Sequence, residues 1–191
     1  MIPIGPLMSE HRLIEKMVKL LQTELATIQE TGQVNTALIS TGGDFFQTYA
    51  DRTHHGKEED ILFRELKEKN LTPEHKKTMD RLVQDHVVAR ATVRALIAAN
   101  DKAVHGDHEA MKEIITCLEK LVDLYPRHIR LEDKEFFYPC MTYFSKKELQ
   151  DMLQEFWEFD RKMIHEKYTK IVKDLEEKKY TKKGGEPHSK E

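Results

Sequence analysis

The sequence predicts an all-α protein, an up-down-up-down four-helix bundle with an additional C-terminal fifth helix. Three observations predict this fold. Apolar residues recur at spacings of three and four over long stretches, no stretch alternates with period two, and short segments of turn residues separate the periodic stretches. Because the connections between the first four helices are only a few residues long, neighbouring helices are expected to run antiparallel.

A glycine marks the boundary between the first two predicted helices. Pro6 is suited to begin the first helix and Gly32 to end it, since proline favours the first helical turn and glycine the position after the last. The second helix is predicted from about Val34 to Asn70. Gly42-Gly43 lies within it, and two glycines lower helix stability, so we expect a bend or a frayed turn there.

The third and fourth helices follow the same pattern. Thr72–Gly106 begins with a Thr-Pro pair and ends with a glycine, which predicts the third helix. The fourth is predicted over residues 107–141. Pro126 lies inside it and removes one backbone donor, so a local kink is expected there.

A capping box marks the start of the fifth helix. Ser145 and Glu148 are spaced so that each side chain can bond the backbone N–H of the other. We therefore predict a bundle over residues 1–142, a C-terminal helix packed on it over residues 145–179, and a flexible tail over residues 180–191.

Composition narrows the functional classes. The chain is 39% hydrophobic and 34% charged with a net charge of −3, and acidic and basic residues alternate, so no basic patch indicates nucleic-acid binding. The first residues lack a basic segment followed by an apolar run, and no apolar stretch is long enough for a membrane helix. Cys117 and Cys140 form no metal-binding motif and are expected to be free thiols in a reducing compartment. We therefore expect a cytoplasmic protein.

A half-pattern of histidine and glutamate occurs twice along the chain. The first copy is His11, His54 and Glu58, and the second, offset by 75, 74 and 74 residues, is His86, His128 and Glu132. Counting residues from the predicted turns, at about 1.5 Å per residue, places one histidine of each helix at the same level of the bundle. Other His-x-x-x-Glu pairs, such as His105/Glu109, do not share this register.

The residue types at this level are metal ligands. On a helix, Glu58 faces the same way as His54, and Glu132 the same way as His128, because residues four apart share a face. Histidine and carboxylate bind borderline metals, and two carboxylates can bridge two ions while histidines bind each ion terminally. Coordination then stays open for water or a diatomic molecule. A closed zinc site with four ligands has little use for two symmetric carboxylates.

Four segments resemble the hemerythrin-like domain family of the His-His-Glu cation-binding type: SEHRLIE, HHGKEEDILF, QDHVVAR and HIRLEDKEFFYP, within residues 9–139. The resemblance implies a non-haem centre of two iron ions, carboxylate-bridged and with an oxo or hydroxo bridge. Its metal ligands would be His11, His54, Glu58, His86, His128 and Glu132. Members of the family bind oxygen or nitric oxide, sense iron or redox state, store iron, or repair iron–sulfur centres.

The third helix departs from the oxygen carriers of that family. Those proteins place two histidines four apart, whereas Arg90 stands four residues after His86 here, so oxygen carriage in their manner is not expected. The favoured function is a di-iron protein that binds oxygen, nitric oxide or peroxide for sensing, scavenging or iron handling. The alternatives are a di-iron enzyme that reduces peroxide or nitric oxide or repairs iron–sulfur clusters, and a structural bundle with adventitious zinc.

Several other polar residues are weighed against this site. His165 is a candidate additional ligand that would replace the missing histidine of the third helix, or a half-buried histidine beside the apolar stripe. His55 is expected outside the ligand set, since aligning Leu62-Phe63 with Phe136-Phe137 matches Glu58 with Glu132 and leaves His55 one step away. Glu10 and Asp85 precede ligand histidines and could orient them, but because neighbouring residues of a helix point about 100° apart, solvated charges are expected instead. The remaining histidines are expected to be exposed: His75, His105, His108 and His188.

Overall fold

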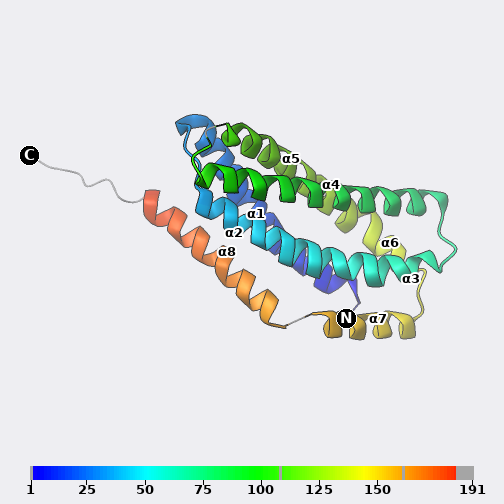
Figure 1. Cartoon of the computed structure of the whole chain (residues 1–191). Coiled ribbons are helices and arrows are strands. Elements are labelled where there is room, and N and C mark those ends of the chain that lie inside the picture. The colour runs from blue at the N-terminus through cyan, green and yellow to red at the C-terminus, as the bar shows by residue number, and fades with distance from the viewer. Residues whose placement is uncertain (1, 108, 161, 184–191) are drawn as a thin grey trace, which may run out of the picture.

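Figure 1 shows the computed structural model of the chain, which describes residues 2–107, 109–160 and 162–183. These residues are almost entirely helical and contain no strand, which confirms the all-α prediction. The elements are α1 (Ile4–Thr31), α2 (Thr36–Phe45), η1 (Phe46–His55), η2 (Glu58–Phe63), α3 (Arg64–Lys67), α4 (Pro73–Val104), α5 (Ala110–Leu131), η3 (Glu132–Phe136), α6 (Phe137–Met141), α7 (Lys146–Phe159) and α8 (Lys162–Lys183), where η marks π-helical segments.

Three of the predicted helix ends are made by the predicted residues, whereas α1 begins at Ile4, before Pro6. Gly32 follows α1 with φ 67°, a backbone conformation that glycine adopts without strain. The Thr72 side chain accepts a hydrogen bond from the His75 N–H and so caps α4. Ser145 and Glu148 form the capping box of α7. Local sequence therefore determines where these helices begin and end.

The glycine pair in α2 has a packing role. Both glycines are buried and helical, so the frayed turn predicted there does not occur. A Cβ added at Gly43 would lie 2.6 Å from Cγ1 of Ile97 in α4, and one at Gly42 would lie 3.2 Å from a methyl carbon of Leu21 in α1. The missing side chains allow α2 to approach both neighbours closely. The irregular backbone begins three residues later, where η1 starts at Phe46.

A π-helical segment also interrupts the fourth helix of the bundle. Helix α5 continues through Pro126 to Leu131, and the change of helix type comes at Glu132, where η3 begins. His54, Glu58 and Glu132 all lie in π-helical segments. Such segments are often found at functional sites, because the wider turn re-aims side chains without breaking the helix.

The bundle interior is divided by a polar layer. One apolar cluster contains Leu21, Phe46 and Leu118 in the half of the bundle near Gly32. A second contains Phe63 and Phe136 in the half near α7. The level of the bundle that carries the predicted histidines lies between the two clusters. Rigid apolar packing therefore holds it from both sides.

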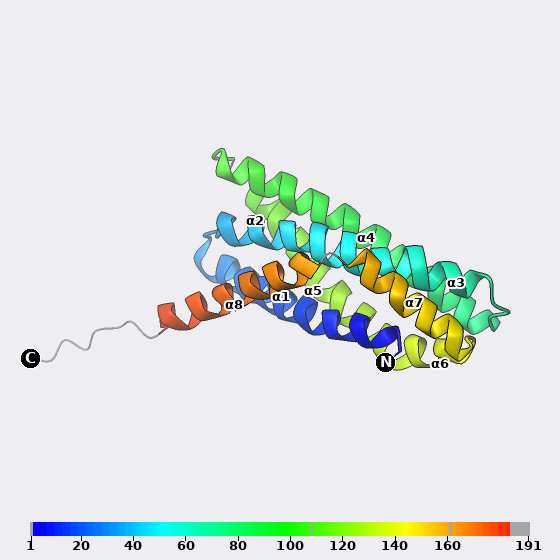
Figure 2. The ribbon, with the colours of Figure 1, turned by 90° about the horizontal axis from the view of Figure 1, so that it is seen from below.

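The predicted fifth helix is two helices. Asp160 adopts an extended conformation and separates α7 from α8, where a single helix was expected over residues 145–179. Helix α7 packs on η2, and α8 packs on α1 and η1; Figure 2 shows both lying along one side of the bundle. Residues 180–183 of the predicted tail are helical, and residues 184–191 lie outside the described part of the chain.

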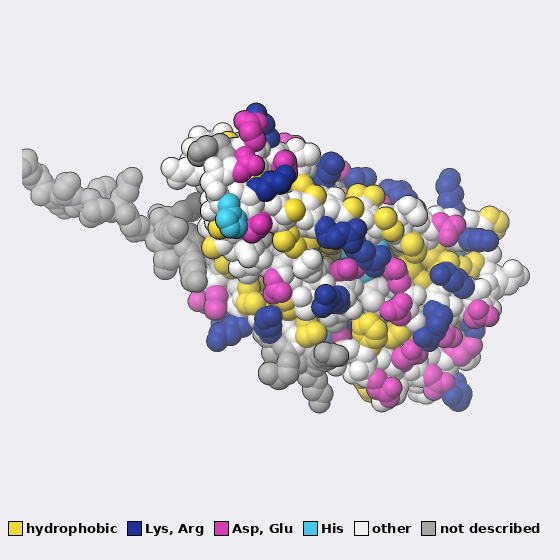
Figure 3. Space-filling model, viewed as in Figure 1, with side chains coloured by type: hydrophobic (Ala, Val, Ile, Leu, Met, Phe, Trp, Pro, Cys, Tyr) yellow, Lys and Arg dark blue, Asp and Glu magenta, His cyan; other side chains and the backbone are white. Residues whose placement is uncertain are grey.

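The surface shown in Figure 3 carries acidic and basic side chains interspersed over one face. Within the described residues, no helix combines the length and apolar character needed to cross a membrane.

Candidate metal centre

Seven buried side chains meet in the polar layer and form two groups that share one glutamate. The first group is His11, His54, Glu58 and Glu132, and the second is His55, Glu58, His86 and His128. Within each group the ligand atoms lie within 4.8 Å of one another. All seven side chains are 2% exposed or less. The structure thus brings together all six residues of the predicted ligand set and adds His55.

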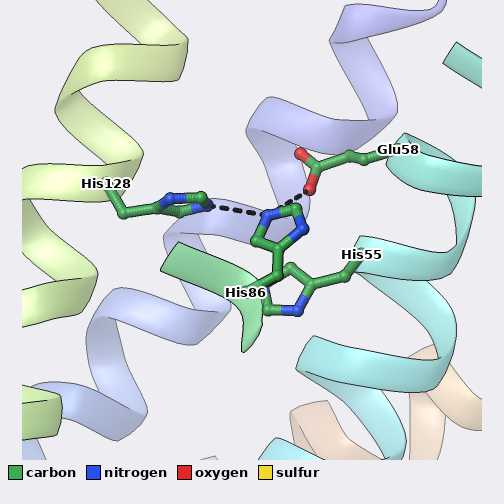
Figure 4. Close-up of side chains that lie close together, drawn as sticks. All are labelled: His55, Glu58, His86 and His128. Atoms are coloured by element: carbon green, nitrogen blue, oxygen red, sulfur yellow. Dashed lines mark hydrogen bonds and ion pairs between the residues drawn. The ribbon is translucent and has the colours of Figure 1, made fainter. Parts of the chain in front are cut away.

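The two glutamates lie between the two sets of imidazoles. Glu58 places Oε1 3.3 Å from Nε2 of His54 and Oε2 3.3 Å from Nε2 of His86. Glu132 places Oε2 3.2 Å from Nε2 of both His11 and His128. Figure 4 shows Glu58 and His128 converging on His86 from different helices. Each carboxylate therefore reaches imidazoles from both halves of the sequence pattern.

The polar atoms at the centre fit a metal. Within the described residues, both carboxylate oxygens of Glu58 and of Glu132 and Nε2 of His11 are buried without a hydrogen-bond partner. Leaving so many buried polar atoms unpaired is costly, and native proteins rarely do it without an ion or water. Ligand atoms about 2.1 Å from one ion and at right angles lie about 3 Å apart, close to the spacings found here.

Carboxylates outside the centre orient three of the imidazoles. His11 donates through Nδ1 to Asp133 at 2.7 Å, and His54 donates to Glu10 at 2.8 Å. His86 makes the same contact with Glu59 at 2.6 Å. A carboxylate on Nδ1 fixes the ring so that Nε2 points inward, as is usual for metal-binding histidines.

Two expectations for the outer carboxylates were tested by these contacts. Glu10 is 3% exposed and hydrogen-bonded, so the prediction of a solvated charge was wrong. Asp85 lies 3.5 Å from Nδ1 of His128 and is partly exposed. It is therefore intermediate between a solvated charge and a carboxylate that orients a histidine. The sequence favours solvated charges over an orienting role, because the adjacent position in an α-helix points about 100° away.

His55, which the sequence places outside the ligand set, is buried among the other residues of the second group. It is 1% exposed and stacks on His86, with ring centroids 3.9 Å apart and planes 14° apart. It lies in η1, where each residue advances less around the axis than in an α-helix, which brings His54 and His55 toward one side. Two imidazoles that bind one ion both lie in planes through that ion, so His55 and His86 bind together only if a ring rotates.

His165 lies apart from both groups. Its Nε2 is 2.9 Å from Asp160 and its Nδ1 is 3.1 Å from the hydroxyl of Tyr49. Glu10, Asp160 and His165 form a third group of ligand-type residues, but the ammonium of Lys57 contacts both of its carboxylates. That group therefore already holds a cation, and the histidine beside His86 and His128 is His55.

The carboxylates of the centre raise the pKa of two of its imidazoles. Burial lowers the pKa of His11, but its hydrogen bond to Asp133 and the adjacent carboxylate of Glu132 outweigh this and raise the pKa to about 9. The same competition, between burial and the carboxylates of Glu132 and Asp85, raises the pKa of His128 to about 10. Burial raises the pKa of Glu132, yet His128 and His11 hold it well below its usual range. The centre is thus arranged to attract positive charge.

A pocket of about 190 Å³ adjoins the second group. It is walled by η1, α4 and α5, and His55 and Tyr125 lie in its lining. Arg52 and Arg94 in the lining are exposed, so the pocket reaches the surface. The remaining lining residues are Phe46, Gln47, Asp51, Ala89, Arg90 and Val93.

Comparison with known proteins agrees with this geometry. The family model described as the hemerythrin HHE cation binding domain matches residues 3–140. That range contains all seven residues of the two groups and ends before α7. No curated protein matches the chain. The chain belongs to the hemerythrin HHE cation-binding family, and its buried histidine and glutamate groups are able to hold metal.

Proposed function

We propose that the chain is a cytoplasmic di-iron protein that binds oxygen, nitric oxide or peroxide, and so serves in sensing, scavenging or iron handling. One observation carries this proposal. Glu58 and Glu132 lie between two sets of imidazoles, and their carboxylate oxygens have no hydrogen-bond partner among the described residues. Two positively charged ions, one in each group, would satisfy these oxygens, with Glu58 common to both groups and Glu132 also in contact with His128.

The donor set favours iron over structural zinc. It consists of imidazole nitrogens and carboxylate oxygens, and neither Cys117 nor Cys140 belongs to either group. Closed zinc sites commonly use thiolates and four ligands for one ion. Iron held by histidine and carboxylate supplies one-electron chemistry and retains positions for small ligands.

The pocket beside His55 supports binding of an external ligand. A volume of about 190 Å³ is too small for a metabolite of ordinary size but sufficient for a diatomic molecule or peroxide. Its lining contains Tyr125 and one member of the second group, His55. A ligand in this pocket would therefore lie against a member of the second group.

The residues of this chain have separable tasks in that function. Asp133, Glu10 and Glu59 orient imidazoles, and the apolar clusters on both sides exclude bulk water from the centre. Dry surroundings strengthen the electrostatic interaction between the carboxylates and any bound cation.

Metal analysis and ligand titration test this function. The chain is purified from iron-supplemented cells, iron and zinc per chain are measured, and the reduced protein is titrated with nitric oxide in the absence of air. Two irons and saturation at a fixed ratio support a binding protein. Continued consumption of nitric oxide or peroxide while reductant is supplied identifies the enzyme alternative. Stoichiometric zinc without iron contradicts both and leaves a structural bundle.

A further inference from the structure

Lys57 has an unusual position for a lysine. Its side chain is 0% exposed, and it lies in the ligand-bearing segment between His55 and Glu58. Lysine is almost never fully buried unless its charge is paired. Two carboxylates pair it here: Nζ contacts Glu10, and it donates to Oδ1 of Asp160 at 2.7 Å.

The first of these carboxylates also holds a candidate metal ligand. Glu10 uses one oxygen for Lys57 and the other for Nδ1 of His54, at 2.8 Å. Asp160, Lys57, Glu10 and His54 thus form a continuous series of charge-assisted hydrogen bonds. The series begins at the link between α7 and α8, outside the family match, and ends at the metal centre.

Charge balance explains why both ends of the series matter. A single ammonium faces two carboxylates, so Lys57 is held from both sides and Glu10 keeps an oxygen for His54. If Asp160 lost its charge, Glu10 would be the only carboxylate on the buried ammonium. The buried cation would then compete with His54 for the same carboxylate.

The C-terminal helices are docked so that Asp160 reaches this position. The extended backbone at Asp160 ends α7 directly beside the segment that carries the ligands. A Cβ at Gly56 would lie 2.7 Å from Cζ of Phe159, so glycine allows the end of α7 to lie against the backbone between His55 and Lys57. A second contact holds α7 closer to its N-terminus, where Glu155 of α7 forms an ion pair with Arg64 of α3.

We propose that Asp160 is a positioning residue for the metal ion on the His11/His54 side, and that it acts through Lys57 and Glu10 on the imidazole of His54. The proposal rests on the di-metal centre proposed above. It makes α7 and α8 part of the centre, although the family domain ends at residue 140.

Iron release from the full chain tests this role. Wild type, Asp160→Asn and Glu155→Gln are loaded with ferrous iron without air, and release to a coloured chelator is followed. Disturbing an outer hydrogen bond of a metal ligand typically costs about 10- to 100-fold in affinity. We expect one of the two irons to leave about tenfold faster from Asp160→Asn and both to leave at the wild-type rate from Glu155→Gln, which loses only a surface ion pair. The phase that persists in His86→Ala identifies the iron on the His11/His54 side.

A double-mutant cycle separates positioning from docking. In a Lys57→Met background, Asp160→Asn should change the iron release rate no further, since the hydrogen bonds that connect Asp160 with Glu10 through Lys57 are already absent. Equal acceleration of both irons in Asp160→Asn and Glu155→Gln, or an unchanged effect of Asp160→Asn in the Lys57→Met background, would overturn the proposal. A wild-type chain that binds no iron would instead refute the proposed function, so the two failures are distinguishable.

Discussion

The Nε2 atoms of His86 and His128 lie 3.1 Å apart inside the bundle, on side chains from α4 and α5. Two imidazole nitrogens reach this separation when a proton or an ion lies between them, since two lone pairs repel. Glu58 lies 3.3 Å from His86 on the same side. A proton shared by the two rings, or an ion bound by both, would satisfy this contact.

Removing a predicted ligand should remove metal. In His54→Ala and Glu132→Ala we expect lower iron content and a lower melting temperature of the iron-loaded chain, because metal bound to the native state stabilises it directly. Metal analysis and thermal unfolding measure both effects. Glu119→Ala, at an exposed position of α5, is the matched control. Full metal content in both ligand variants would show that the site is elsewhere.

His55 provides a separate test, because the sequence places it outside the ligand set and the structure places it among ligand-type side chains. If its ring rotates to bind the ion of the second group, His55→Ala should weaken one iron by roughly tenfold or more and spare the other. His105→Ala, at an exposed position near the end of α4, should change neither. Equilibrium titration against a competing chelator measures the two affinities. Equal affinities in wild type and His55→Ala would leave His55 a packing residue.

The stability of the metal-free chain should fall as pH rises. His11 and His128 have folded-state pKa values of about 9 and about 10, above the ordinary 6.5 for histidine. A raised pKa stabilises the protonated native state, so this contribution is complete below pH 6.5 and is lost as pH rises through 9 to 10. The melting temperature of the metal-free chain measured between pH 6.5 and 9.5 should therefore decrease.

Metal binding should show the opposite dependence. An ion needs deprotonated imidazoles, so binding at pH 7.5 releases the protons held by His11 and His128, and apparent affinity rises with pH. Calorimetry in two buffers of different ionisation enthalpy counts the released protons. A metal-free chain that grows more stable over the same window, or binding without proton release, would contradict the pKa shifts.

Gly56→Ala tests the docking of α7. The new methyl group would meet the ring of Phe159, and we expect destabilisation of about 1–2 kcal/mol from overpacking. Phe159→Ala in the same chain makes room for the methyl group and should recover part of the loss that Gly56→Ala causes, beyond the cost of removing the ring. Chemical denaturation of wild type, the two single variants and the double variant measures this coupling. Simple additivity of the two substitutions would argue against the contact.

Sequence reasoning was most successful where local chemistry decides the structure. The caps at Gly32, Thr72 and Ser145 follow from backbone preferences, and the structure confirms them. The meeting of His11, His54, His86 and His128 at one level follows from helix rise and short connections, and needs no knowledge of packing. The first inference depends on local backbone preferences and the second on distances along the chain.

Other features depend on contacts that residue spacing does not contain. The π-helical backbone of η1 brings His55 inward. No glycine or proline within η1 indicates the change from α-helix to π-helix. The helix ends at Asp160 without a glycine or proline at that position. The extended residue instead forms an ion pair with Lys57, which is distant in the sequence. Buried carboxylates such as Glu10 are likewise recognised only when their partners are seen.

X-ray absorption at the iron edge of the iron-loaded chain tests the central claim most directly. We predict nitrogen and oxygen neighbours only, together with scattering from a second iron between about 3 and 4 Å away, as expected for two ions that share carboxylates. Sulfur neighbours, or iron bound without a second metal at that distance, would contradict a centre bridged by Glu58 and Glu132.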